Sequence, residues 1–232
     1  MLSTVLFVMY WFLAKSEIIK QKFFTKYTFD EAARKHIFFT KYLGFFLLGI
    51  VPSIFAMCIL GKDLKSMGLW FNGNTTVFSI IWIVVLAIII IPLTYYAAKR
   101  PSNLLNYPQI RAKIWTRKTF FINLLGWSIY LFGYELFFRG VFLFTLVDEL
   151  GIPFAISVNV MFYTLSHIPK GLGETLGALP FGLLLCFLTI QSATIWIAYF
   201  SHLILAFTNC LTALAHHKEI YFQGWTKKRL NG

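Results

Sequence analysis

The sequence predicts an all-α protein, a polytopic bundle of about seven transmembrane helices. Hydrophobic residues make up 58% of its 232 residues and aromatic residues 19%, which is more apolar surface than a soluble domain of this length can bury. Apolar runs follow one another along the whole chain, separated by short polar connections. Basic residues lie almost entirely in alternate connections, which is the charge pattern of a membrane protein.

Each apolar run predicts one helix. In chain order the runs comprise residues 2–14, 42–60, 76–98, 120–147, 152–168, 176–190 and 195–214. The first is shorter than the roughly 20 residues that span a bilayer comfortably. Since it has neither a basic start nor a small-residue cleavage site, we interpret it as a short span or interfacial segment, not as a signal peptide. Pro52 and Pro92 lie inside two runs, where membrane helices tolerate proline.

The distribution of Lys and Arg predicts the orientation of the helices. One side of the membrane receives only Lys62 and Lys65, next to the acidic turn at Asp148 and Glu149. By the positive-inside rule, the N-terminus then lies outside and the C-terminus in the cytoplasm. The charged stretch 15–41 is either an amphipathic helix or hairpin on anionic headgroups or ordinary loop charge. The cytoplasmic connections carry Lys15, Lys20, Lys22, Lys26, Arg34, Lys35, Lys41, Lys99, Arg100, Arg111, Lys113, Arg117, Lys118, Lys170, Lys218, Lys227, Lys228 and Arg229.

The composition also disfavours two classes of binding site. The net charge of +12 does not indicate nucleic-acid binding, because the basic residues separate apolar runs and do not interleave with aromatics on one surface. Cys58, Cys186 and Cys210 lie in apolar segments without CxxC spacing. We therefore expect them to be core residues, and we expect neither disulfides nor a structural zinc site.

Two ionisable residues interrupt the apolar run 120–147. Glu135 and Arg139 are four residues apart, so their side chains share one helical face and can neutralise each other. An ionisable residue at the centre of a membrane helix costs about 2.5–3.5 kcal/mol on insertion scales and by default marks a functional site. The pair is therefore either a buried brace or one corner of a reaction centre.

Two histidines lie in the later runs at a depth similar to that of Glu135. At about 1.5 Å per residue, Glu135 lies ~18 Å, His167 ~22 Å and His202 ~12 Å below the outer turns. We therefore expect the three side chains to share one layer near the middle of the bilayer. The alternative for each histidine is a core residue that is hydrogen-bonded to a carbonyl group.

Three neighbouring polar residues have more than one interpretation. Asn209 lies seven residues after His202, on the same helical face, where it can orient the histidine or form an interhelical hydrogen bond. Ser166 and Ser201 immediately precede the histidines. Since adjacent residues diverge by about 100° on a helix, a Ser–His dyad formed by neighbours has poor geometry.

Three motifs together resemble those of a known family. They are YELFFRG in the run 120–147, YTLSH in the run 152–168 and SH in the last run. In this order they resemble the CPBP family, the CAAX protease and bacteriocin-processing (Abi) membrane proteins, over residues 120–210. The resemblance implies a glutamate-dependent intramembrane endopeptidase of a bacterial inner membrane, without a cofactor, whose histidines position the attacking water and stabilise the oxyanion. Its expected partners are membrane lipids and a peptide or lipoprotein substrate, CAAX-like or bacteriocin-leader-like.

The first motif departs from the family pattern of two glutamates. Tyr134 occupies the position of the first, water-activating glutamate, followed by Glu135 and the motif arginine, Arg139. Because a phenol does not ionise at neutral pH, Tyr134 is a poor general base. Either Glu135 has taken over, which requires a rolled or irregular helix, or the site does not hydrolyse peptides. Glu174 is a distant substitute.

The other two motifs keep their histidines. The second motif places Tyr163 and His167 in this sequence, with tyrosine where the family has phenylalanine. The third motif places His202, but Ala206 stands where the family has a variable asparagine. The resemblance therefore implies catalytic roles for both histidines and for Glu135, with Arg139 in support.

Three functions remain open. The first is a peptidase of this family, and the second is a catalytically impaired relative that acts as a membrane immunity or scaffold protein, as Tyr134 and Ala206 suggest. The third is a metal or proton-coupled transporter that uses the same carboxylate and histidines, although the H-E-x-x-H spacing of zinc sites is missing.

We expect residues 1–118 to form N-terminal helices and basic segments, 119–215 the core with the polar site and 216–232 a cytoplasmic tail. The oligomeric state is not predicted.

Overall fold

Each predicted apolar run is helical over most of its length in the computed structural model, which describes residues 2–71 and 73–223, so the all-α class is confirmed. The N-terminal helices are α1 (Leu2–Ala14), α2 (Glu17–Lys26), α3 (Phe29–Gly44), the π-helix η1 (Phe45–Ile50) and α4 (Val51–Ile59). The next are α5 (Gly73–Ala98), α6 (Pro101–Leu104), α7 (Arg117–Glu135), the π-helix η2 (Leu136–Leu143) and α8 (Phe144–Leu150). The last are α9 (Ile152–Leu165), the 3₁₀ turn η3 (Ile168–Lys170), α10 (Leu172–Ser192) and α11 (Trp196–His216).

Five helical stretches of the described chain are long and apolar enough to cross a membrane. They are Phe29–Ile59, Gly73–Ala98, Arg117–Leu150, Leu172–Ser192 and Trp196–His216. The two other runs of the expected seven form α1, with 13 residues, and α9, with 14 residues. At about 1.5 Å per residue these helices are roughly 20 Å long, less than the ~30 Å hydrocarbon core.

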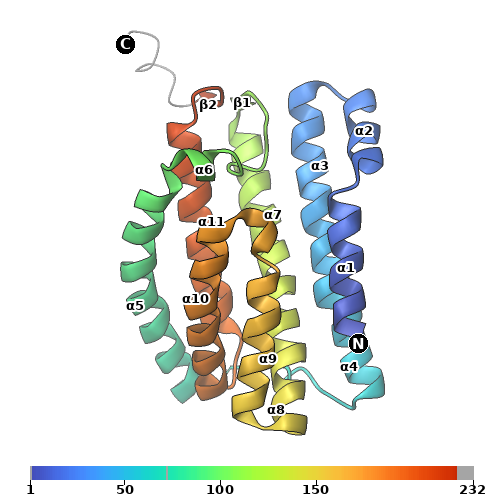
Figure 1. Cartoon of the computed structure of the whole chain (residues 1–232), viewed down its shortest axis with the longest axis vertical. Helices are drawn as coiled ribbons and strands as arrows, with labels where there is room; N and C mark the ends of the chain where they lie inside the picture. The colour runs from blue at the N-terminus through green and yellow to red at the C-terminus, as the bar shows by residue number, and fades with distance from the viewer. Residues whose placement is uncertain (1, 72, 224–232) are drawn as a thin grey trace.

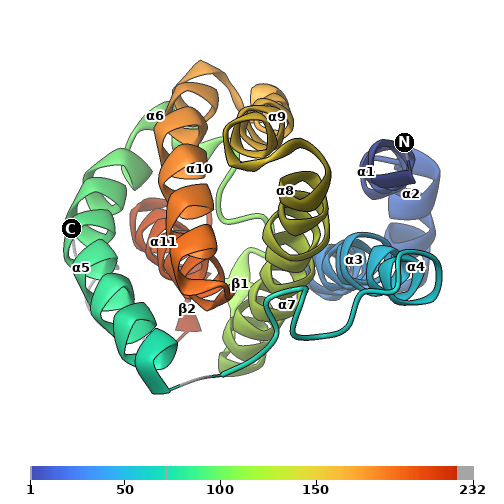
Figure 2. The same cartoon turned by 90° about the horizontal axis from the view of Figure 1, so that it is seen from below.

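The helices form two groups that meet at α7. Figure 2 shows α11 between α5, α10 and α7, with α1 to α4 together on the other side of α7. The two groups approach closely at Gly49 of η1 and Gly133 of α7. A Cβ atom on Gly49 would lie 2.8 Å from the Cα atom of Gly133, and one on Gly133 would lie 2.8 Å from the Cα atom of Phe45. Only glycine therefore allows this backbone contact.

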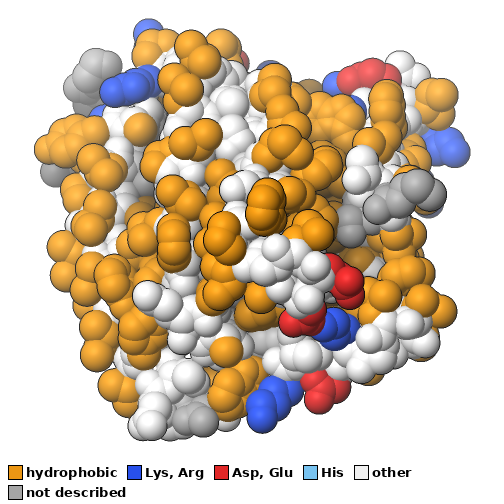
Figure 3. Space-filling model, turned by 60° about the horizontal axis from the view of Figure 1, so that its bottom comes forward, with side chains coloured by type: hydrophobic (Ala, Val, Ile, Leu, Met, Phe, Trp, Pro, Cys, Tyr) orange, Lys and Arg blue, Asp and Glu red, His pale blue; other side chains and the backbone are white. Residues whose placement is uncertain are grey.

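The outer surface is apolar, as an integral membrane protein requires. Large hydrophobic side chains of α5 are more than half exposed at Ile80, Ile81, Val84 and Ile88. Figure 3 shows hydrophobic side chains over most of the visible face and charged ones in a few small groups. With lipid as the solvent for this surface, the polar groups that are buried inside the bundle require an explanation of their own.

The charged stretch 15–41 forms a helical hairpin. Its first helix, α2, is capped by Ser16, which accepts a hydrogen bond from the Ile19 backbone N–H at 3.4 Å, and has no buried residue. The second helix, α3, continues into the first long apolar span. We expected Lys41 in a cytoplasmic connection, but it lies inside α3 and is only 5% exposed, because α7 packs over it.

A two-residue parallel ladder ties the C-terminal segment to the start of α7. Strand β1 (Ile114–Trp115) pairs with β2 (Tyr221–Phe222), at the same end of the bundle as α6 (Figure 1). Residues 224–232 of the expected tail lie outside the described residues, and with them Lys227, Lys228 and Arg229. The connection from α9 to α10 lies well below this end of the bundle (Figure 1), because α9 is short.

Candidate active site

The site is built around an irregular turn in the third long span. α7 ends at Glu135, and the following residues of η2 form wider π-helical turns. The wider turn releases backbone carbonyl groups from their usual partners, and Asn159 of α9 donates from Nδ2 to the Phe138 carbonyl oxygen at 2.6 Å. The local irregularity that a catalytic Glu135 would require is therefore present one residue after it.

Glu135 and Arg139 form the expected buried pair. Arg139 Nε lies 3.6 Å from Glu135 Oε2, and both side chains are fully buried. The guanidinium group also lies over the Tyr163 ring, 4.4 Å from its centroid, and Nη1 donates to Asn159 Oδ1 at 3.5 Å. The positive charge is thus held between a carboxylate, an amide and an aromatic face, which fixes it as a brace for Glu135.

The other oxygen of Glu135 is hydrogen-bonded to His202. Nδ1 of His202 lies 2.6 Å from Glu135 Oε1. Since an ionised carboxylate can only accept, this contact places the proton on Nδ1 and leaves Nε2 of a neutral imidazole as a proton acceptor. Glu135 therefore fixes both the orientation and the tautomer of His202.

His167 lies just beyond the end of α9, and not inside a helix as its apolar run predicted. α9 ends at Leu165, and Nδ1 of His167 turns back to the Tyr163 carbonyl oxygen at 2.8 Å. A carbonyl oxygen can only accept, so His167 also carries its proton on Nδ1 and keeps Nε2 as an acceptor. Because the helix has ended, Ser166 Oγ comes within 3.2 Å of His167 Nδ1. The separation of about 100° expected for helical neighbours therefore does not apply here.

Although Ser166 lies close to His167, its hydrogen bonds make it a structural support for Tyr163 and Tyr134. Its hydroxyl donates to the Tyr163 carbonyl oxygen at 2.7 Å and lies 2.9 Å from the Tyr134 hydroxyl. Nδ1 of His167 carries a proton and cannot take one from Ser166. This arrangement does not activate the serine as a nucleophile.

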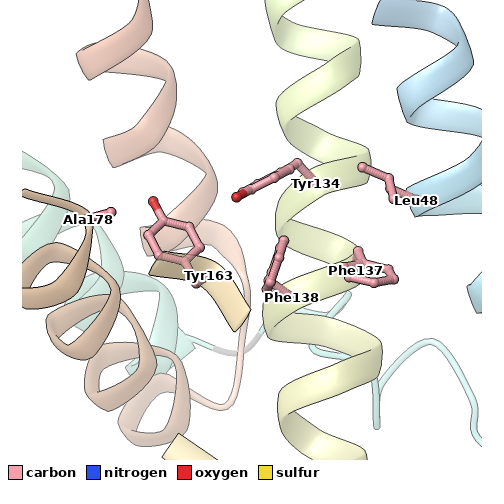
Figure 4. Close-up of a cluster of buried hydrophobic side chains, with 6 residues drawn as sticks. All are labelled: Leu48, Tyr134, Phe137, Phe138, Tyr163 and Ala178. Atoms are coloured by element: carbon pink, nitrogen blue, oxygen red, sulfur yellow. The ribbon is translucent and has the colours of Figure 1, made fainter. Parts of the chain in front are cut away.

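Tyr134 and Glu135 both reach the histidines. The Tyr134 ring meets the edge of the His202 ring at a centroid distance of 5.6 Å, and its hydroxyl connects through Ser166 to His167. Figure 4 shows Tyr134 and Phe138 pointing from the α7–η2 segment toward Tyr163. The motif left open whether Tyr134 or Glu135 acts on the histidines. In the structure both residues contact His202: Glu135 is hydrogen-bonded to it, and the Tyr134 ring packs beside it.

Both histidines line one cavity of about 270 Å³. Glu174 shares this lining and lies 3.7 Å from Lys170, so the carboxylate expected to be distant faces the same space. Glu135 is not among the described lining residues and lies behind His202. The two imidazole rings therefore face the cavity directly, whereas the Glu135 carboxylate can act on a bound molecule only through His202. The remaining lining residues that bear on the motifs are Tyr163, Ala206 and Asn209.

Asn209 forms the interhelical hydrogen bond that was one of its two interpretations. Its Oδ1 accepts a hydrogen bond from Asn103 Nδ2 of α6 at 2.8 Å.

Sequence reasoning did not single out Asn103 or Asn159, although an asparagine inside an apolar run such as that of α9 is a detectable signal. Within the described chain, no three His, Cys, Asp or Glu side chains are grouped so that they could hold a metal ion.

The comparisons with known proteins agree with the motifs. Residues 114–208 match the family model described as type II CAAX prenyl endopeptidase Rce1-like. The matched segment begins at β1 and ends inside α11, and it includes Tyr134, Glu135, His167 and His202. No curated protein and no solved structure matches the chain. The match confirms the resemblance to the CAAX protease and Abi family for this segment.

Proposed function

We propose, from the match of residues 114–208 to an endopeptidase family, that this integral membrane protein hydrolyses membrane-associated peptides. The observation that carries the proposal is the 2.6 Å hydrogen bond between Glu135 and His202, at the edge of a cavity that His167 also lines. A histidine held by a buried carboxylate is the arrangement that general-base catalysis uses elsewhere.

In the proposed reaction, His202 activates the water. Nε2 of His202 takes a proton from a water molecule in the cavity, and the resulting hydroxide attacks the carbonyl carbon of the peptide bond. The C–N bond breaks when the same proton passes to the leaving nitrogen. Glu135 stabilises the imidazolium ion that forms between these steps, and His167 accepts a second hydrogen bond that positions the water.

This assignment accounts for the unusual first motif. Glu135 acts through His202, so no second carboxylate is required at position 134. Tyr134 instead packs against the edge of His202 and limits its movement. Arg139 neutralises Glu135 while His202 is uncharged, which lowers the cost of keeping a carboxylate inside the bundle.

The charge distribution supports a cytoplasmic location for one end of the bundle. Many of the Lys and Arg residues lie in or next to α2, α6 and β1, which share this end (Figure 1). We propose that this end faces the cytoplasm of a bacterial cell. The opposite end carries Lys62, which pairs with Asp148, and Lys65.

The test is cleavage of a prenylated peptide by the purified protein in detergent, followed by mass spectrometry. The unmodified protein should cleave, and His202→Ala should reduce kcat/KM by about 10²–10⁴-fold, the usual contribution of a general base. Ser201→Ala is the matched control, because it changes the adjacent buried residue of the same helix. Equal cleavage by both variants contradicts the proposal. Absence of cleavage of both prenylated and unprenylated peptides by the unmodified protein favours an immunity or scaffold role.

A further inference from the structure

A second, larger cavity lies between the two helix groups. Its volume is about 660 Å³. The lining residues come from α1, α2 and α3 on one side, and from α7, η3 and the connection between α6 and β1 on the other. Of the described lining residues, it shares only Tyr107, Trp127 and Lys170 with the histidine cavity. This cavity therefore belongs to the contact between the helix groups.

The charge that lines this cavity is mainly positive. Glu17 is the single acidic residue among its described lining residues, and its carboxylate is already paired with Lys20 at 3.1 Å. Lys170 is paired at 3.7 Å with Glu174, which lies outside this lining. The described part of the chain provides no carboxylate partner for the other basic lining residues, which are Lys15, Lys41 and Arg111.

Lys41 is the buried member of this group. It is 5% exposed, and its Nζ atom lies 2.9 Å from the centroid of the Trp127 ring and 4.9 Å from that of Tyr130. The aromatic rings offset only part of the cost of burying an ammonium group, and the charge of Lys170 opposes that of Lys41. An anionic group in the cavity would supply the missing counter-charge.

Two of the lysines stand at the polar ends of apolar runs. Lys15 directly follows the run 2–14, and Lys41 directly precedes the run 42–60. The boundary between apolar and polar segments is the depth at which the headgroups of a bilayer lie. The basic group of the cavity is therefore at the level of phospholipid phosphates.

The wall that α1 and α2 contribute is aromatic and apolar. It contains Phe7, Tyr10 and Trp11 of α1 and Phe24 of α2. Trp11 lies in the last turn of α1, with Lys15 Nζ 5.3 Å from its ring centroid, and Trp next to Lys is typical of the headgroup region. A ligand that fills this cavity must therefore combine an anionic group for Lys41 with an apolar part for α1.

We propose that this cavity binds an anionic phospholipid, with its phosphate group at Lys41 and its acyl chains against α1. A soluble phosphate shares the first contact but not the second. The lipid supplies the counter-charge that the described chain lacks at Lys41, and it connects the N-terminal helices with α7. This binding is independent of peptide hydrolysis.

The test measures lipid binding to the purified protein in detergent by native mass spectrometry. It compares phosphatidylglycerol with phosphatidylcholine of identical acyl chains, because both contain a phosphate but only the first has a net charge. Phosphatidylglycerol should bind at least about ten-fold more tightly. Lys41→Met should abolish this preference, and Lys41→Arg should retain it. Lys15→Met, at an exposed lining residue, should weaken phosphatidylglycerol binding by about five-fold and keeps the proposal testable if Lys41→Met does not fold.

Lys99→Met is the matched control. Lys99 also stands at the end of an apolar run, 76–98, and also lies over an aromatic ring, 3.6 Å from the Tyr95 centroid, but it does not line the cavity. This variant should keep the preference.

Three results overturn the proposal. The first is an equal preference in a folded Lys41→Met protein, and the second is no preference in the unmodified protein. The third is displacement of phosphatidylglycerol by inorganic phosphate at equal concentration, because the site then selects a soluble anion without using the apolar wall. Binding that resists inorganic phosphate and depends on Lys41 but not on Lys99 supports the lipid site.

Discussion

Two buried cations of this protein, Arg139 and Lys41, have different environments. Arg139 is fully buried, with Glu135 at 3.6 Å and Asn159 at 3.5 Å. Lys41 is buried but 5% exposed, and it faces an aromatic ring and a cavity instead of a carboxylate. A buried charge whose counter-charge belongs to the protein is part of the scaffold. Lys41, without such a counter-charge, contacts the Trp127 and Tyr130 rings instead.

The two cations also divide between the two helix groups. Arg139 lies in the segment that matches the endopeptidase family, whereas Lys41 lies in the N-terminal helices outside it. The two helix groups thus hold their buried cations by different contacts. Four substitutions test this difference.

The largest effect is expected on kcat/KM, in the variant Glu135→Gln. The amide no longer stabilises an imidazolium ion on His202, and its NH₂ group can favour the wrong tautomer, so kcat/KM should fall by about 10⁴-fold. The comparison is with Asp148→Asn, which removes an exposed partner of Lys62 and should leave kcat/KM unchanged. A Glu135→Gln protein with near-normal activity would show that His202 does not act through this carboxylate.

The next effect is a loss of stability in Arg139→Met. Methionine preserves much of the volume but leaves Glu135 buried without its counter-charge, which should lower the free energy of unfolding by about 3–5 kcal/mol. Thermal unfolding in detergent, followed by the fluorescence of a thiol-reactive dye at Cys186 and Cys210 in a Cys58→Ser background, measures the shift. The double variant Glu135→Gln with Arg139→Met should recover part of the loss, and no recovery would contradict the pairing.

A smaller loss is expected in Asn159→Ala. This change removes the donor to the Phe138 carbonyl oxygen and an acceptor for Arg139, so the free energy of unfolding should fall by about 1–3 kcal/mol. The same thermal assay applies, with Ser157→Ala, at an exposed position of the same helix, as a control outside this network. Equal stability of the two variants would show that Asn159 does not support the irregular turn.

The smallest effect is expected in Lys41→Met. Since no described carboxylate loses a partner, the free energy of unfolding should stay the same or rise by up to about 1 kcal/mol. This result in the same assay would separate Lys41 from Arg139 as a charge that does not stabilise the fold. A loss as large as that of Arg139→Met would remove the distinction between the two cations.

The sequence predicted the helices and the meeting of the polar residues well. Run length located the apolar spans, because burial in lipid and in the bundle both require apolar side chains, but it missed most of α3, whose residues 29–41 lie in the charged stretch. Helix depth alone placed Glu135 and His202 in one layer, and they are hydrogen-bonded in the structure.

Three features could not be predicted from the same signals. The π-helical turn of η2 depends on which carbonyl groups find partners in α9, and the residue pattern does not encode this. His167 was assigned to a helix because its neighbours are apolar, although α9 ends before it. Lys41 stands between a charged stretch and an apolar run, and its burial depends on the position of Trp127, 86 residues later in the chain.

The π-helical turn makes the site sensitive to chain length as well as to side-chain identity. Turns closed by i→i+5 hydrogen bonds hold more residues than α-helical turns of the same span. Deletion of one residue between positions 140 and 143 would let this segment return to a regular α-helix, in which the Phe138 carbonyl oxygen has a backbone partner within the helix. Every motif residue would remain, but Asn159 would lose the free carbonyl group that it binds in η2. The geometry around Glu135 is therefore sensitive to a single in-frame codon that removes no motif residue.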